Sequence, residues 1–215
     1  MTAVSVDLGT GTTIGTTANE GVEPHVNWTQ QTGFPNFTAT NLEDDTTTAT
    51  TVDLQLSNAK ANNSTRASGS GDLFNMFTRG VNVDGPSAST DLIWGQITDE
   101  YTTYNLYVYF CELTTSTGGN ISFTDGTTTY YYENQAADNF NSGTLTRVTS
   151  TSSGTPSTTG NYVLFEGLTA AAPTIEVMSD TDAVQIGLVG CQVVESTAGS
   201  SVAPLAFHHL QKLRY

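Results

Sequence analysis

The sequence contains little positive charge. Of its 215 residues, 6 are Lys or Arg and 21 are Asp or Glu, which gives a formal net charge of -15. Such a surface repels polyphosphates at long range, so we expect no nucleic-acid partner. The same charge keeps a protein dissolved where salt screens it, and we expect an extracellular, cell-surface or particle-surface location.

Long apolar runs are also missing. The longest candidate, residues 183–194, is interrupted by Gln185 and Gln192 and is shorter than the roughly 18 residues that a membrane span needs. This predicts no membrane insertion. The opening MTAVSVDLGT has no basic segment followed by an apolar one, which predicts that a secretion signal is absent or has been removed.

Cysteine and histidine are too scarce for common kinds of site. Cys111 and Cys191 are too few for a disulfide framework or a thiolate metal site. Both lie in apolar, strand-like runs, which favours two buried free thiols and leaves a disulfide as the alternative. The adjacent His208 and His209 point to different sides of a strand or helix, and no Gly-x-Ser-x-Gly elbow is present. We therefore expect no enzyme and predict no catalytic residues.

Acidic residues could serve two other kinds of site. Glu112, Glu133 and Glu166 lie in or beside aromatic runs, but spacing along the chain does not bring two of them to the separation that glycoside hydrolysis needs. Hard oxygen ligands occur in residues 43–45 (Glu-Asp-Asp) and 180–182 (Asp-Thr-Asp). A structural calcium ion is therefore the one cofactor considered, with plain acidic turns as the alternative and no other metal or cofactor predicted.

One short motif resembles a nucleotide site. Residues 6–13 read VDLGTGTT, which is similar to the first phosphate loop of the actin, heat-shock-chaperone and sugar-kinase ATPases. The rest of the chain lacks alternating strands and helices, a second phosphate loop and the basic residues that balance phosphate charge. The motif is therefore interpreted as part of a strand and its following turn.

Short strand-like segments fill the sequence instead. Each is bounded by Gly, Pro, Asn or Ser; they cover residues 3–9, 49–57, 90–98, 104–113, 120–125, 127–133, 161–168, 173–179 and 183–194. Asp125-Gly126 predicts a hairpin between residues 120–125 and 127–133. This pattern predicts an all-β fold, a single antiparallel β-sandwich in residues 1–197. One short helix is expected at residues 72–79, and residues 198–215 are expected to form a tail.

Alternation within residues 104–113 assigns the two faces of one strand. Leu106, Val108 and Phe110 fall on one side, and Tyr107, Tyr109 and Cys111 fall on the other. Because both sides are apolar, this strand and the similar run IGLVGCQVV are predicted to be central and covered on both faces.

Aromatic residues supply the candidate ligand site. Sugar-binding sandwiches use exposed rings as stacking platforms, and the candidates here are Trp28, Trp94, Tyr101, Tyr104 and Tyr131. In the run 130–132, alternation exposes either Tyr131 or the pair Tyr130 and Tyr132. The alternative is that most of these rings fill the core or line a subunit contact.

The last segment, APLAFHHLQKLRY, differs from the rest of the chain. It carries Lys212, Arg214 and two histidines, and its apolar residues recur at helical spacing. We expect such a tail to dock on its own domain or on a neighbouring subunit; the assembly candidates are Phe207, Leu210, Leu213 and Tyr215. The alternative is a frayed end or a non-native extension.

The series of strand segments, taken in order, resembles that of a known class of domains. SVDLG, YTTYNLYVYF, ISFTDGTTTYYYE, NYVLFEGL, PTIEVMS and VQIGLVGCQVVE resemble secreted bacterial jelly-roll domains of the carbohydrate-binding-module and malectin-like kind over residues 3–195. The resemblance implies a non-catalytic surface module that recognises glycans or mediates adhesion. The alternative is a structural subunit of a virion, filament or surface layer. The expected partners are glycans or neighbouring protein subunits, with a homo-oligomer as one arrangement.

Overall fold

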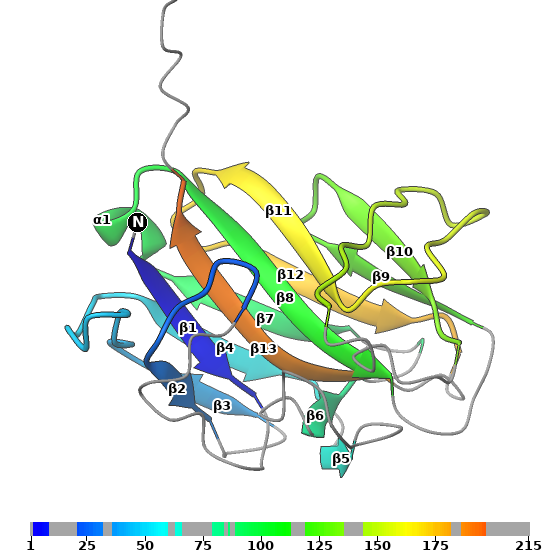
Figure 1. Cartoon of the computed structure of the whole chain (residues 1–215), viewed down its shortest axis with the longest axis horizontal. Helices are drawn as coiled ribbons and strands as arrows, with labels where there is room; N and C mark the ends of the chain where they lie inside the picture. Colours follow the sequence, from blue (N-terminus) through cyan, green and yellow to red (C-terminus); the bar gives the residue numbers. More distant parts are fainter. Residues whose placement is uncertain are drawn as a thin grey trace, which may run out of the picture.

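The protein is a β-sandwich of two sheets, seen face-on in the computed structural model (Figure 1). The structure describes residues 2–8, 21–31, 36–59, 63–65, 79–83, 86, 89–112, 119–135, 144–181 and 186–196. The seven-stranded sheet contains β1 (Ala3–Asp7), β2 (Trp28–Gln30), β5 (Asn63–Thr65), β6 (Arg79–Asn82), β8 (Tyr104–Glu112), β11 (Tyr162–Leu168) and β13 (Ile186–Glu195). The six-stranded sheet contains β3 (Phe37–Ala39), β4 (Asp53–Ser57), β7 (Thr90–Gly95), β9 (Asn120–Thr124), β10 (Thr129–Glu133) and β12 (Thr174–Ser179).

The order of strands within each sheet shows how the chain moves between the layers. The first sheet runs β11-β8-β13-β1-β2, and β6 pairs with both β13 and β5. The second sheet runs β10-β9-β12-β7-β4-β3. Nearly all pairs are antiparallel, β1 with β2 being parallel. All nine strand segments expected from the sequence form strands, so the all-β prediction is confirmed.

The core lies between the two sheets because apolar residues alternate on their inner faces. Leu106, Val108 and Phe110 of β8 point inward and are fully buried. The ring of Phe110 contacts the rings of Phe123 and Tyr132 from the opposite sheet, at centroid distances of 5.0 and 4.9 Å. This contact joins the layers at the end that carries the site described below.

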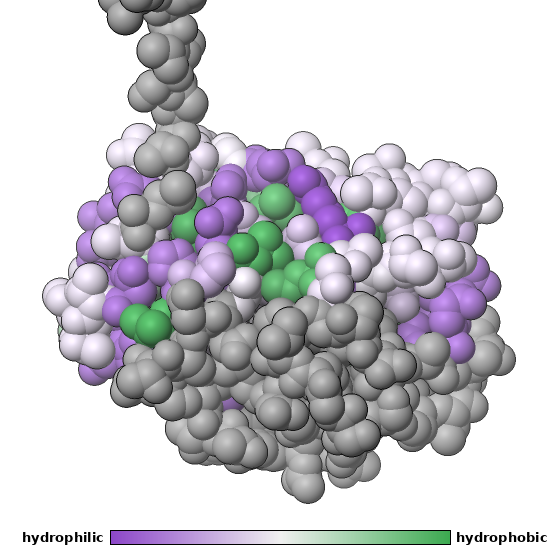
Figure 2. Space-filling view, in the orientation of Figure 1, coloured by the Kyte–Doolittle hydropathy of each residue, from purple (hydrophilic) through white to green (hydrophobic). Residues whose placement is uncertain are grey.

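The outer face of the seven-stranded sheet is also covered, as predicted for β8. Tyr107, Tyr109 and Cys111 form a second apolar cluster with Trp28 and Leu164. Figure 2 shows small apolar areas on this face with polar residues beside them. β13 lies beside β8 and is buried along nearly its whole length, so the prediction of two central strands is confirmed.

An irregularity in β13 changes which of its residues face the inner core. The register with β8 shifts between Leu188 and Gly190, where one extra residue is inserted. This bulge reverses the side-chain alternation, so that both Leu188 and Cys191 belong to the inner core. Cys111 lies in the outer cluster, on the other face of the sheet. The two buried cysteines are therefore free, which is the interpretation that the sequence favoured.

A buried polar network fastens residues 21–23 to the outer face of the sheet. The Tyr109 hydroxyl donates to Oε1 of Gln192 and accepts a hydrogen bond of 2.9 Å from the backbone N–H of Val22. The Gln192 amide donates to Ser5 Oγ at 3.0 Å and to the Glu23 carbonyl at 3.2 Å. Gln192 is fully buried, so these bonds replace the water that its amide would otherwise need.

Several buried tyrosines resist ionisation because the charged phenolate is poorly solvated in the interior. Burial raises the pKa of three of them to about 12: Tyr101, Tyr104 and Tyr107. The pKa of Tyr109 is also raised well above its ordinary value, mainly by burial.

The helix and two turns differ from the sequence-based expectations. Residues 72–78 of the expected helix lie outside the described residues, and Arg79 begins β6. The described helix is α1 (Ile97–Glu100), which begins at the end of the segment 90–98 that was expected to be extended. Gln96 adopts a left-handed conformation with φ of 57°, which ends β7 and starts α1. The hairpin between β9 and β10 is confirmed, but its connection spans residues 125–128 because Thr124 pairs with Thr129.

Candidate functional site

Four of the five candidate stacking residues lie in the interior. The exposed fractions are 4% for Trp28, 1% for Trp94, 3% for Tyr101 and 0% for Tyr104. Trp94, Tyr101 and Tyr104 belong to the core between the sheets, and Trp28 belongs to the outer cluster. A ring that stacks on a sugar needs one open face, and none of these four has one in this structure. Their positions match the alternative interpretation that they pack the fold.

Tyr131 is placed differently. It is half-buried on β10, whereas its neighbour Tyr132 is 1% exposed and points into the core. The Tyr132 hydroxyl donates to the buried carboxylate of Glu112 at 2.6 Å. Tyr130, on the same side as Tyr132, contacts Phe165 edge-on at a centroid distance of 5.4 Å. Of the two alternatives for this run, the structure therefore has Tyr131 directed to the outer face.

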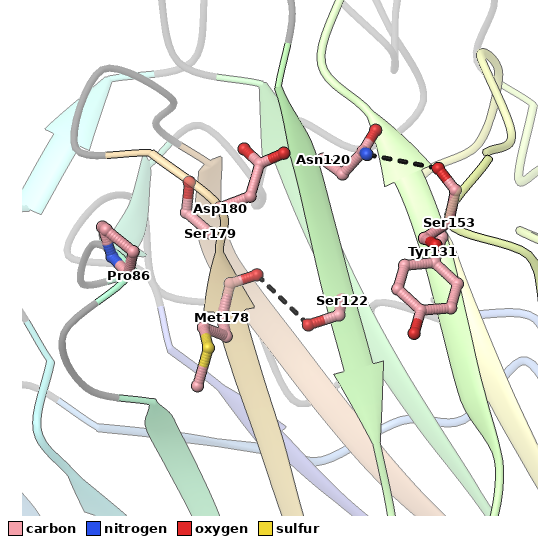
Figure 3. A pocket seen from close by; sticks show the side chains of 8 residues that line it. All are labelled: Pro86, Asn120, Ser122, Tyr131, Ser153, Met178, Ser179 and Asp180. Atoms are coloured by element: carbon pink, nitrogen blue, oxygen red, sulfur yellow. Dashed lines mark hydrogen bonds between the residues drawn. The ribbon is translucent and has the colours of Figure 1, made fainter. Parts of the chain in front are cut away.

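Tyr131 forms one wall of a trough across three strands. The register pairs Tyr131 on β10 with Ser122 on β9, and Ser122 with Met178 on β12. Figure 3 shows the Tyr131 ring and the Met178 thioether on either side of the small Ser122. Neighbouring strands lie roughly 4.8 Å apart, so the side chains of Tyr131 and Met178 are separated by about 10 Å. Ser122, on the strand between them, forms the floor of the trough.

Polar groups surround one end of the trough. The whole hollow has a volume of about 240 Å³; it is lined by Pro86, Asn120, Ser122, Tyr131, Ser153, Met178, Ser179 and Asp180. Pockets that enclose drug-sized ligands measure roughly 300–1,000 Å³, so this one suits a single ring of a larger ligand. Asp180 is exposed, and within the described residues no hydrogen bond engages its carboxylate. We call this hollow the Tyr131 hollow.

The wall beside Tyr131 is held by hydrogen bonds from backbone and side-chain groups. The backbone N–H of Tyr131 donates to the carbonyl of Ser150 at 2.9 Å, and the N–H of Ser157 donates to the carbonyl of Tyr131 at 3.0 Å. Ser150 Oγ donates to the carbonyl of Thr155 at 2.6 Å, which closes the intervening turn. The Asn120 amide reaches the Ser153 carbonyl at 3.4 Å. The wall is thus fixed before any ligand arrives, which reduces the entropy lost on binding.

A second hollow lies between the edge strands β2 and β3. It measures about 440 Å³ and is lined by Asn27, Thr29, Gln31, Ala39, Thr40, Asn41, Leu42 and Glu43. The Asn27 amide already donates to Glu43 Oε2 at 3.3 Å and to the Asp44 carbonyl at 2.7 Å. None of the described residues that line this hollow is aromatic, so among them it lacks the stacking surface that the Tyr131 hollow has.

The acidic cluster at residues 43–45 is engaged in hydrogen bonds of its own. Asp44 Oδ1 accepts from the backbone N–H groups of Thr46 and Thr48, at 2.8 and 2.9 Å. Burial alone would raise the pKa of Asp44, but the hydrogen bonds from these threonines outweigh burial and lower it. Asp45 lies 3.2 Å from Nδ1 of His25. Among the described residues, no group of three or more His, Cys, Asp or Glu side chains is arranged to hold a metal ion.

The carboxylates considered for hydrolysis lie in different settings. Glu112 is fully buried and accepts from Tyr132 and from the backbone N–H of Gln135, at 2.6 and 2.7 Å. Glu166 is paired with Arg147 at 2.9 Å. Asn120 and Met178, by contrast, were not considered as ligand-binding residues from the sequence, and Asp180 was considered only as a calcium ligand. Their place beside Tyr131 follows from pairing between distant strands.

The remaining predictions fall on other parts of the chain. The assembly candidates Phe207, Leu210, Leu213 and Tyr215 lie outside the described residues, as does Asp182 of the second acidic group. Within the described residues, no helix is long and apolar enough to cross a membrane. Comparison with protein-family models, curated proteins and solved structures finds no match for this chain. Its function must therefore be argued from the site itself.

Proposed function

We propose that this protein is a non-catalytic glycan-recognition module with a jelly-roll sandwich, which binds one saccharide ring in the Tyr131 hollow. The observation that carries the proposal is the combination of a half-exposed ring, an apolar wall opposite it, and polar side chains at one end. Sugars present apolar C–H faces and polar hydroxyl edges, and a site of this composition complements both.

The jelly-roll part of the proposal is supported by the path of the chain. Successive strands cross between the sheets repeatedly, from β7 to β8, from β8 to β9, and again around β11 and β12. The first and last described strands, β1 and β13, pair antiparallel near the middle of one sheet. The outer face of the six-stranded sheet carries the Tyr131 hollow on β9, β10 and β12.

Calorimetry with neutral oligosaccharides found by a glycan array tests the proposal. Tyr131→Ala removes the stacking ring and is expected to weaken binding roughly tenfold, which corresponds to about 1.4 kcal/mol. Tyr131→Phe keeps the ring and serves as the matched control, with affinity within about threefold of the parent. The proposal fails if no saccharide binds at millimolar concentration, or if Tyr131→Ala binds as the parent does.

A subunit of a virion, filament or surface layer is the second candidate. All 21 acidic residues lie at or before position 195, whereas Lys212 and Arg214 lie in the last four residues. A basic, amphipathic segment could contact the acidic body of a neighbouring copy. Deletion of residues 204–215 should then abolish association while leaving the melting temperature unchanged. Light scattering that finds only monomer with this segment intact contradicts this candidate.

A further inference from the structure

Several carboxylates lie on the outer sheet face around the Tyr131 hollow. Asp180 lines the hollow itself and is exposed. Glu133 lies two positions from Tyr131 on β10, and its register partner is Asn120. Glu176 lies two positions from Met178 on β12 and is exposed, next to Asp91 of β7 in the register. Because alternate residues of a strand share a face, these carboxylates and the trough lie on the same side of the sheet.

Among the described side chains, the positive charge that could balance them is engaged elsewhere. Arg147 is the only Lys or Arg whose side chain falls within the described residues. Its guanidinium donates to Glu166 Oε2 at 2.9 Å, to the Leu164 carbonyl at 3.1 Å and to the Tyr130 hydroxyl at 3.3 Å. Tyr130 points to the inner side of β10, opposite to Tyr131, so this cation does not line the hollow. A ligand in the hollow therefore meets negative charge alone among the described side chains.

We infer, on the basis of the proposed function, that the Tyr131 hollow selects saccharides with a free amino group, takes neutral saccharides more weakly, and excludes uronates and sulfated sugars. A protonated amine next to Asp180 forms a charge-assisted hydrogen bond, which is stronger than the bond from a hydroxyl at the same position. An acidic sugar is repelled both by Asp180 and by the field of a chain with net charge -15.

The size of the preference follows from the exposure of Asp180. Exposed ion pairs contribute modestly because water and salt screen them, so we expect roughly three- to tenfold tighter binding for the amine than for the hydroxyl. The preference should nearly disappear at about 1 M salt, where the Debye length is about 3 Å. Stacking on Tyr131 does not depend on charge, so neutral saccharides should lose little affinity under the same conditions.

Four linear tetrasaccharides of equal length provide the test: glucosamine, glucose, N-acetylglucosamine and galacturonate. Calorimetry is performed at a mildly acidic pH, where sugar amines are protonated and exposed Asp carboxylates remain ionised. The expected order of affinity places glucosamine first, glucose and N-acetylglucosamine next, and galacturonate below detection. Equal binding of glucosamine and glucose, or tight binding of galacturonate, would overturn the inference.

Two matched variants test whether the preference for amino sugars arises in the Tyr131 hollow. Asp180→Asn removes one charge and keeps the shape of the side chain, so the glucosamine preference should fall to less than about twofold while glucose binding stays the same. Asp99→Asn changes the net charge equally but lies on α1, which Figure 1 shows far from β9 and β10. It should leave the preference intact.

The outcomes also separate the inference from the proposed function. A preference that survives Asp180→Asn contradicts the inference. Binding of glucose that depends on Tyr131 but shows no amine preference overturns the inference and leaves the glycan-binding proposal in place. Binding of none of the four tetrasaccharides, at any salt concentration, overturns both.

Discussion

The network around Tyr109 and Gln192 allows a stability effect to be worked out from the structure. The variant Tyr109→Phe keeps the aromatic ring and its packing but removes the hydroxyl. Two hydrogen bonds are lost, one to the fully buried Gln192 Oε1 and one from the backbone N–H of Val22. A buried polar group left without its partner destabilises by roughly 1–3 kcal/mol. Because Val22 is half-buried and can regain part of its bond from water, we expect a total loss of about 2–4 kcal/mol.

Urea unfolding followed by circular dichroism measures this loss. The midpoint should fall while the slope of free energy against urea stays constant, because the surface exposed on unfolding is unchanged. Tyr162→Phe is the matched control, since this ring belongs to the same cluster and its hydroxyl makes no hydrogen bond within the described part of the chain. The control should change stability by less than about 0.5 kcal/mol. A Tyr109→Phe variant that matches the control would refute the role assigned to the network.

Three further predictions concern the packing of the fold. The buried tyrosines with pKa near 12 contribute stability fully below pH 10, and this contribution should be lost as pH rises toward 12. The melting temperature should therefore fall over that range, and a melting temperature that stays constant between pH 10 and 12 would contradict this. Both cysteines are buried, so they should react with an alkylating reagent only after denaturation, as judged by mass. Gly160→Ala places a Cβ 2.6 Å from a Val148 methyl at φ of 147°, and should destabilise by about 1–3 kcal/mol in thermal melts, whereas Gly154→Ala should be nearly neutral.

Much of the fold could be predicted from the sequence because the side chains of a strand alternate between its two faces, and consecutive residues reveal this alternation. The apolar alternation in β8 predicted both of its buried faces, since every second residue must share a side. The short strands β2, β3, β5 and β6 were not predicted. Each consists of three or four residues in a polar segment. These residues form strands because they pair with neighbouring strands, and their own composition indicates this only weakly.

The candidate site was predicted only in part, for a different reason. The alternation around Tyr131 offered two orientations, and packing of Tyr132 and Tyr130 on the inner side decided between them. Trp94 and Tyr104 have the composition of a stacking platform, yet the largest rings of a sandwich this size also fill its core. Met178 and Asp180 come close to Tyr131 through the pairing of β12 with β9, which joins residues more than 50 positions apart.

The most direct test of glycan recognition is a nuclear magnetic resonance titration of the isotopically labelled protein with a neutral tetrasaccharide. We expect saturable chemical-shift changes concentrated on the residues of the hollow, namely Asn120, Ser122, Tyr131, Met178 and Asp180, with the backbone of α1 unchanged. Shifts that are absent at millimolar ligand, or that gather between β2 and β3 and leave Tyr131 unaffected, would contradict the assignment of the binding site.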